Sequence, residues 1–135
     1  MRDANFGPIR SEHPFAWLWE PLEAEATFVL RSMFGAKAAY LDGKIMLCFP
    51  MRGEEWKGVL VCTDRKDHAS LMAEFPVLTP HSILSKWLFL PERAEHFERV
   101  AQKLVALAQR RDPRIGVLPQ PKARRTKARK SKKAD

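Results

Sequence analysis

The clearest pattern in the sequence is a pair of short apolar segments that flank Asp42-Gly43. Asp-Gly is a strong signal for a type I′ turn, because both central positions of that turn need a positive φ. The pattern therefore predicts an antiparallel hairpin with strands at about 37–41 and 44–50. The expected register pairs Leu41 with Lys44, Tyr40 with Ile45, Ala39 with Met46 and Ala38 with Leu47. One apolar face would then hold Ala38, Tyr40, Ile45 and Leu47.

Three further segments are candidates for strands of the same sheet. Residues 57–63 are apolar and rich in Val, which predicts a central strand, and residues 86–90 (KWLFL) predict another. Residues 27–34 are ambiguous. They could continue a preceding helix that ends at Gly35, or they could form a strand, which their β-branched and aromatic content slightly favours.

Helical spacing of apolar residues predicts three helices. The first spans about 14–25 and is interrupted near Pro21, and the second spans about 65–74 with Asp64 as its cap. The third is expected to start with Pro91 at its first position and to end at Asp112-Pro113. Its apolar stripe consists of Phe97, Val100, Ala101, Leu104, Leu107 and Ala108.

This order of elements predicts an α+β fold of two layers, in which helices flank a single antiparallel sheet. The expected organisation is a flexible leader at 1–12, one domain at 13–118 and a disordered basic tail at 119–135. The tail contains no apolar residue larger than Ala beyond Pro121, so it cannot offset the entropy of ordering itself.

Motifs for catalysis or cofactor binding are missing from the sequence. It has no GxSxG, P-loop, GxGxxG or HExxH pattern, and its histidines are scattered at positions 13, 68, 81 and 96. We therefore expect no enzyme activity, no catalytic residue, no cofactor and no metal site. Cys48 and Cys62 form no CxxC pair, which fits a reduced cytoplasmic protein, although they could meet on neighbouring strands as a disulfide.

The net charge of +8 is concentrated at the C-terminal end. Residues 122–135 carry a net charge of +7, because eight cations there face a single carboxylate, Asp135. The eight cations are Lys122, Arg124, Arg125, Lys127, Arg129, Lys130, Lys132 and Lys133. Such a segment can neutralise phosphates and release counterions without reading sequence, which predicts non-specific binding to DNA or RNA.

Two other roles for the tail stay open: a solubilising or ribosomal-RNA-adhering appendage, and a contact with an anionic membrane surface. The tail has no aromatic residue on which a base could stack, so we do not expect it to recognise single strands specifically. No apolar segment of the sequence is long enough to span a membrane. We expect a cytoplasmic protein, which could also associate with the nucleoid.

The hairpin also carries a resemblance to a known family. Arg31-Ser-Met-Phe-Gly35 followed by Tyr40-Leu-Asp-Gly-Lys44 resembles the RxMFG…YLDGK pattern of the TfoX N-terminal-domain family. Residues 86–91 and the segment after them are similar to YjbR (MmcQ)-like proteins, and together these features cover roughly residues 15–118. The resemblance implies a secretion-chaperone-like α+β domain and a strand at 27–34. The resemblance implies no catalytic residues. YjbR-like proteins have been proposed to bind DNA.

The sequence thus predicts a non-enzymatic regulatory or binding domain that associates with nucleic acid through its tail, while the folded part binds a protein partner or dimerises. The alternative is a protein-interaction or adaptor module with an incidental tail. A third possibility, a small-molecule binder or enzyme that uses the concave side of the sheet, is the least favoured of the three.

Overall fold

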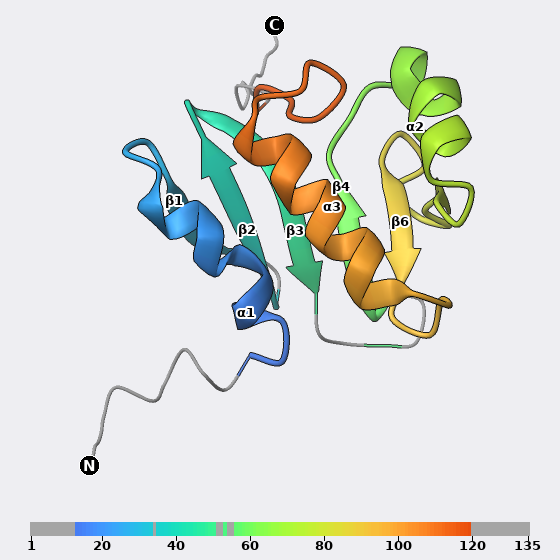
Figure 1. The fold of residues 1–135 in the computed structure, drawn as a ribbon, viewed down its shortest axis with the longest axis horizontal. Coiled ribbons are helices and arrows are strands. Elements are labelled where there is room, and N and C mark those ends of the chain that lie inside the picture. Colours follow the sequence, from blue (N-terminus) through green and yellow to red (C-terminus); the bar gives the residue numbers. More distant parts are fainter. Residues whose placement is uncertain (1–12, 34, 51–52, 54–55, 120–135) are drawn as a thin grey trace, which may run out of the picture.

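The computed structural model describes residues 13–33, 35–50, 53 and 56–119. These residues form one six-stranded antiparallel sheet with the strand order β1-β2-β3-β4-β6-β5. Figure 1 shows α1 and α3 side by side across one face of the sheet, while α2 lies at its β6 end. The two-layer α+β class expected from the sequence is therefore confirmed. The expected leader at 1–12 lies outside the described residues.

The elements follow one another along the chain with short connections. Their bounds are α1 Ala16–Trp19, the 3-10 helix η2 Glu20–Ala24, β1 Val29–Met33, β2 Ala36–Leu41, β3 Lys44–Pro50, β4 Gly58–Val61, the 3-10 helix η4 Arg65–Asp67, α2 His68–Glu74, β5 Thr79–Pro80, β6 Leu88–Pro91 and α3 Phe97–Gln109. The ambiguous segment thus contains a strand, β1, and residue 34 lies outside the described residues. The first helix changes from α to 3-10 geometry just before Pro21, which agrees with the expected interruption.

The hairpin turn is confirmed, but the register beyond it is not. Asp42 and Gly43 have φ values of 56° and 79°, as a type I′ turn requires, and Leu41 and Tyr40 pair with Lys44 and Ile45 as expected. Next to these pairs, a bulge in β3 leaves Met46 without an opposite residue. Ala39 therefore pairs with Leu47, and Ala38 with Cys48.

The bulge changes which side chains share a face. The expected set of Ala38, Tyr40, Ile45 and Leu47 is wrong at its last member, because Leu47 packs with Met46 in the helix-covered core. Cys48 takes its place and packs with Ala38 and Ile45 on the opposite face. One extra residue in a strand is enough to reverse the side on which every later side chain lies.

The start of the third helix is also a correction. Pro91 does not begin this helix; it is the last residue of β6, where it pairs with Gly58. The Glu92 N–H then donates to the Lys57 carbonyl (2.9 Å), and the Ala94 N–H donates to the Pro91 carbonyl (3.0 Å), so the chain turns after β6 before the helix begins. α3 begins at Phe97, after His96 in a left-handed conformation with φ of 61°. The expected apolar stripe of this helix faces the core, with Val100 half-buried.

Two smaller expectations also differ from the structure. Asp64 precedes η4, but its side chain makes no capping hydrogen bond; its backbone carbonyl accepts the Asp67 N–H at 2.9 Å. The segment between Pro76 and Pro80, to which the sequence patterns assigned no helix or strand, contains the short edge strand β5. The pairing of this strand with β6 depends on a neighbour distant in sequence, which local patterns do not reveal.

Buried side chains form two clusters, one on each face of the sheet. The larger one lies between the sheet and the helices and includes Trp19, Phe49 and Leu104, with the Trp19 and Phe49 ring centroids 5.1 Å apart. The smaller one, here called the second cluster, lies on the opposite face. Its buried members are Ala38, Ile45, Cys48, Leu60, Cys62 and Phe89. Tyr40, Trp56, Trp87 and Val117 pack partly buried against it.

The two cysteines meet within the second cluster, as the sequence left open, but they are free thiols. Their sulfur atoms are 3.9 Å apart, and both side chains are buried. In the described part of the chain, no helix has both the length and the apolar character needed to cross a membrane.

Candidate functional site

All eight cations assigned to nucleic acid binding, Lys122 to Lys133, lie outside the described residues. The structure does show where the chain leads into them. Val117 lies beside β3, because its N–H and carbonyl exchange hydrogen bonds with Ile45 at 3.1 and 2.9 Å. This bridge places the last described residues at the end of the sheet that carries the hairpin turn (Figure 1). The segment Pro113–Pro119 is called the C-terminal segment below.

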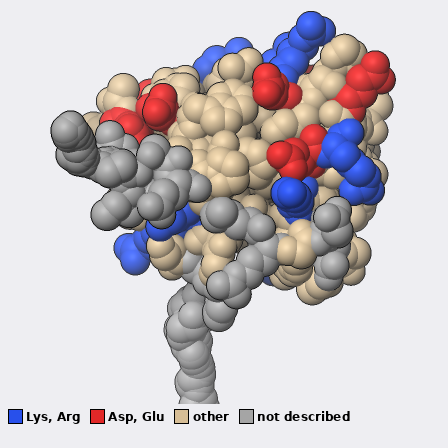
Figure 2. Space-filling view, turned by 90° about the horizontal axis from the view of Figure 1, so that it is seen from below, with Lys and Arg blue, Asp and Glu red and all other residues tan. Residues whose placement is uncertain are grey.

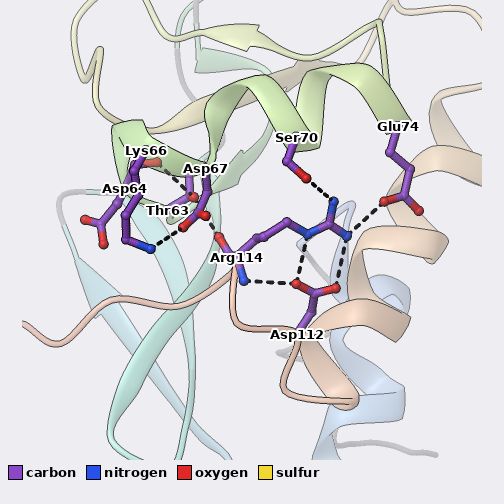
Figure 3. Close-up of polar contacts among 8 residues, drawn as sticks. All are labelled: Thr63, Asp64, Lys66, Asp67, Ser70, Glu74, Asp112 and Arg114. Atoms are coloured by element: carbon purple, nitrogen blue, oxygen red, sulfur yellow. Dashed lines mark hydrogen bonds and ion pairs between the residues drawn. The ribbon is translucent and has the colours of Figure 1, made fainter.

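Arg114 anchors the C-terminal segment to α2 and to the end of β4 (Figure 3). Its guanidinium donates to the carboxylates of Asp112 at 3.0 Å and Glu74 at 2.8 Å, and to the Ser70 hydroxyl at 3.0 Å. Its backbone carbonyl accepts the hydroxyl of Thr63 at 2.6 Å. The hydrogen bonds from Arg114 also lower the pKa of Asp112, so this network stays charged at neutral pH.

Gly116 allows the C-terminal segment to approach the sheet closely. Its N–H donates to the Cys62 carbonyl at 2.7 Å, and its φ is 108°, a conformation that favours glycine. A Cβ at this position would lie 2.6 Å from the sulfur of Met46. The segment therefore continues the sheet at the point where β4 turns away toward α2.

A cleft of about 580 Å³ opens between the C-terminal segment and the sheet. This volume lies within the range of about 300–1,000 Å³ that is usual for small-ligand sites. Residues distant in sequence line it, among them Tyr40, Lys44, Asp64, Lys86, Trp87 and Val117. Tyr40 and Ile45 come from the hairpin, Thr63 and Asp64 follow β4, and Lys86 and Trp87 precede β6.

The wall formed by Lys86 and Trp87 is held in place by residues at the start of α2. The His68 Nε2–H donates to the Lys86 carbonyl at 2.9 Å, and Arg65 donates to the Ser85 hydroxyl at 3.1 Å. These contacts fix the backbone of the wall and leave its side chains to line the cleft.

The charged groups of the cleft make no ion pair or hydrogen bond with other described residues, although the charge of Lys44 helps to lower the pKa of Asp42. Lys44 and Lys86 are exposed, and neither ammonium group makes an ion pair or hydrogen bond with another described residue. Asp64 is exposed as well, and Figure 3 shows its carboxylate pointing away from the Arg114 network. The cleft thus offers two cationic groups and one anionic group to a ligand.

Trp87 adds an unsatisfied donor to the wall. Its Nε1 atom is buried and has no hydrogen-bond partner in the structure. A buried donor without a partner costs about 1–3 kcal/mol, and native proteins contain few of them.

A smaller hollow of about 330 Å³ lies next to the cleft and shares Tyr40 and Pro119 with it. The guanidinium carbon of Arg31 lies 5.5 Å from the centre of the Tyr40 ring, within the range of a cation–π contact. Tyr40 therefore borders both hollows. We call Arg31, Tyr40, Lys44, Lys86 and Trp87 the aromatic–basic strip.

The sequence did not reveal this strip as a site. Arg31 and Tyr40 belong to the motif that carries the family resemblance, and we expected them to be structural residues. Lys86 and Trp87 were expected to begin a strand. No sequence pattern could have shown that these residues are neighbours, because only the folded β-sheet brings together β1, β2, β3 and the segment before β6.

The histidines have structural roles or lie on the surface. His13 is buried with its Nε2–H donating to the Phe49 carbonyl at 2.9 Å, and its burial lowers its pKa. His81 is buried too, and its Nδ1 accepts the N–H groups of Ile83 and Leu84, both at 3.1 Å. His96 is exposed and His68 is half-buried. Within the described ranges, no group of three or more His, Cys, Asp and Glu side chains is placed to hold a metal ion.

Another hollow of about 580 Å³ lies between the N-terminal segment and the start of α3, on the helix side of the molecule. Its lining mixes Trp17 with the carboxylates Glu92 and Glu98 and with Arg99. Because Glu92 and Glu98 lie beside Arg99 in this hollow, we do not expect it to attract a polyanion.

Charge on the described surface is mixed. Figure 2 shows small groups of acidic and basic residues separated by uncharged ones, without a continuous field of one sign among the described residues of that face. The fold and site define a small two-layer α+β protein with a cleft beside the origin of a basic segment. Comparison with models of known protein families, with curated proteins and with solved structures found no match for this chain.

Proposed function

We propose that this protein is a non-enzymatic nucleic-acid-binding protein whose Lys/Arg-rich segment at 122–133 provides most of the affinity. The observation that carries the proposal is the distribution of charge: seven of the eight net positive charges lie in residues 122–135. Eight cations spaced by small residues can each neutralise a phosphate and release its counterion. The TfoX-like resemblance of the hairpin and the YjbR-like resemblance of residues 86–91 support the same proposal.

The position of the cleft supports it too. The basic segment begins three residues after Pro119, which lines the cleft together with the unpaired cations Lys44 and Lys86. A polyanion bound to the basic segment would therefore lie close to cations of the folded domain. The mixed charge on the face drawn in Figure 2 gives such a ligand less reason to bind there.

The test measures binding of a dye-labelled DNA duplex across a series of salt concentrations. The full chain is compared with a full-length variant in which the eight cations are replaced by Gln, and with a chain that ends at Pro121. For the native protein we expect a slope of log K against log[salt] that approaches about −7, from roughly −0.9 per phosphate contact. Both altered chains should lose most of the affinity and most of the slope.

Equal affinity in all three proteins, or binding that does not change with salt, would contradict the proposal. That result would favour the alternative, a protein-interaction or adaptor module in which the basic segment plays no part in binding. Thermal unfolding of each protein serves as the control that the folded domain is intact.

A further inference from the structure

We propose that the cleft beside the C-terminal segment is a stacking site for an unpaired base, so that the protein prefers single-stranded nucleic acid to duplex. This inference rests on the proposed function, since the basic segment would supply most of the affinity. What the cleft adds is the aromatic surface that the segment itself lacks.

The first argument is the combination of residue types. Binding sites for single strands pair a positively charged path for the backbone with aromatic side chains on which bases stack. The aromatic–basic strip has both, with Tyr40 and Trp87 as the aromatic residues and Arg31, Lys44 and Lys86 as the cations. Tyr40 and Trp87 are only partly buried, although both pack against the second cluster.

The second argument is continuity with the basic segment. Val117, Leu118 and Pro119 line the cleft, and the first of the eight cations, Lys122, follows three residues after Pro119. A strand whose base enters the cleft would therefore have phosphates within reach of both Lys44 and the first cations of the segment. Lys44 and Lys86 are free to meet phosphates, because neither is paired with a described carboxylate.

The third argument concerns hydrogen bonding inside the cleft. Nucleobases present N–H donors at their edges. The carboxylate of Asp64 lines the cleft and makes no hydrogen bond with another described residue, so it can accept from such an N–H group. An aliphatic ligand without an N–H or O–H group would leave this carboxylate unused.

The shape of the cleft decides between single strand and duplex. A cleft of about 580 Å³ has room for one base that is turned away from its neighbours, but it cannot admit a helix. In a duplex the faces of the bases are stacked on one another and hidden, so no aromatic side chain can stack on them. Duplex binding should therefore be independent of the aromatic residues of the cleft.

The experiment uses the full chain and two dye-labelled probes: an oligothymidylate of about 12 nucleotides, within the usual site size of roughly 4–16, and its duplex with oligodeoxyadenylate. Tyr40→Ala and Trp87→Ala should each weaken single-strand binding by about fivefold or more, since stacking of one base is worth about 1–3 kcal/mol. Duplex binding should stay close to that of the native protein. Tyr40→Phe and Trp87→Phe keep a ring face and should retain most of the single-strand affinity.

A second pair of variants keeps the test decisive if loss of an aromatic residue destabilises the fold. Lys44→Glu/Lys86→Glu changes two exposed side chains of the cleft, and Arg93→Glu/Lys103→Glu makes the same charge change at exposed positions outside it. The cleft pair should weaken single-strand binding clearly more than the control pair.

The outcomes separate the two proposals. Native single-strand affinity in folded alanine variants, or equal losses in the two charge-reversal pairs, would overturn the stacking site. The role of the basic segment would stand if neutralising that segment still abolished binding to both probes. If the native protein bound neither probe, the proposed function would itself fail.

Discussion

Arg111 lies at the C-terminal end of α3 with a φ of 58°, a left-handed conformation in which glycine is the usual residue. The backbone forms a Schellman motif: Arg111 N–H donates to the Ala108 carbonyl at 2.9 Å, and Asp112 N–H donates to the Leu107 carbonyl at 3.0 Å. The side chain compensates for the strained backbone, because it reaches Asp42 at 2.8 Å and Glu25 at 2.9 Å. A single residue thus joins the end of α3 to the hairpin turn and to the segment after η2.

The contact between Arg111 and Asp42 predicts a pH-dependent stability. Hydrogen bonds from Arg111 and from Thr27 lower the pKa of Asp42 to about 2, against 3.8 for an unperturbed group. The ionised carboxylate therefore stabilises the fold above about pH 4, and this contribution disappears as the pH falls toward 2. Asp42→Asn should lower the melting temperature at pH 7, and the difference from the native protein should vanish near pH 2.

Glu23→Gln is the matched control, because Glu23 is exposed and makes no ion pair with a described residue. It should leave the melting temperature almost unchanged at every pH. A difference for Asp42→Asn that stayed constant from pH 7 to pH 2 would show that Arg111 does not act through the charge of Asp42.

At the scale of elements, two glycines determine how the strands join. Gly43 completes the type I′ turn between β2 and β3, and a Cβ there would meet nothing within 4 Å. Gly58 starts β4 with a φ of 153°, and a Cβ there would overlap the carbonyl oxygen of Leu90 on β6. Gly43 is needed for its positive φ, whereas Gly58 is needed both for its positive φ and for the close approach of β4 and β6.

These different roles predict different costs of substitution. Gly43→Ala should destabilise the protein by about 1–2 kcal/mol, the cost of a left-handed conformation for a residue with a Cβ. Gly58→Ala should cost clearly more, because the strained φ is combined with a clash against backbone that cannot move without opening the β4–β6 pairing. Denaturant unfolding measures both free energies.

Gly43→Val extends this comparison within the turn, since a β-branched residue resists a positive φ more than Ala does. It should destabilise more than Gly43→Ala. If Gly58→Ala were as stable as Gly43→Ala, the close approach of β4 and β6 would not constrain the sheet.

At the scale of the whole molecule, the sheet separates two buried clusters that differ in composition. The helix-covered cluster contains the largest aromatic and aliphatic side chains, and the second cluster contains both cysteines. Burial, followed by the hydrogen bond between Cys62 and Cys48, raises the pKa of the Cys62 thiol. A thiol held in its neutral, inaccessible form is a poor nucleophile.

Both cysteines should therefore resist a thiol reagent such as DTNB while the protein is folded. Reaction should require opening of the sheet, and the rate should be lower than in denaturant by about 10³ or more if opening costs above about 4 kcal/mol. The measurement is the appearance of the coloured thiolate product with and without urea. Rapid reaction of two thiols in the native protein would contradict the packing of the second cluster.

Several parts of the fold could be predicted because their signals are local. Asp42-Gly43 indicated the turn, the Val-rich segment indicated β4, and the apolar stripe from Phe97 to Ala108 indicated the buried face of α3. The aromatic–basic strip could not be predicted, because Arg31, Tyr40 and Trp87 approach one another only through strand pairing. The bulge at Met46 could not be predicted either, since residues 45–49 are all apolar and carry no alternation that would reveal an extra residue.

By itself, the sequence determined the type I′ turn, the order of the elements and the concentration of charge at 122–133, because these depend on backbone preferences and on composition. Only the tertiary structure decided the register beyond the turn, the start of α3 and the existence of the cleft. Each of these depends on contacts between residues far apart in the chain, such as Val117 with Ile45 and Arg114 with Glu74. Those contacts form the cleft between the sheet and the C-terminal segment, on which the proposed stacking site depends.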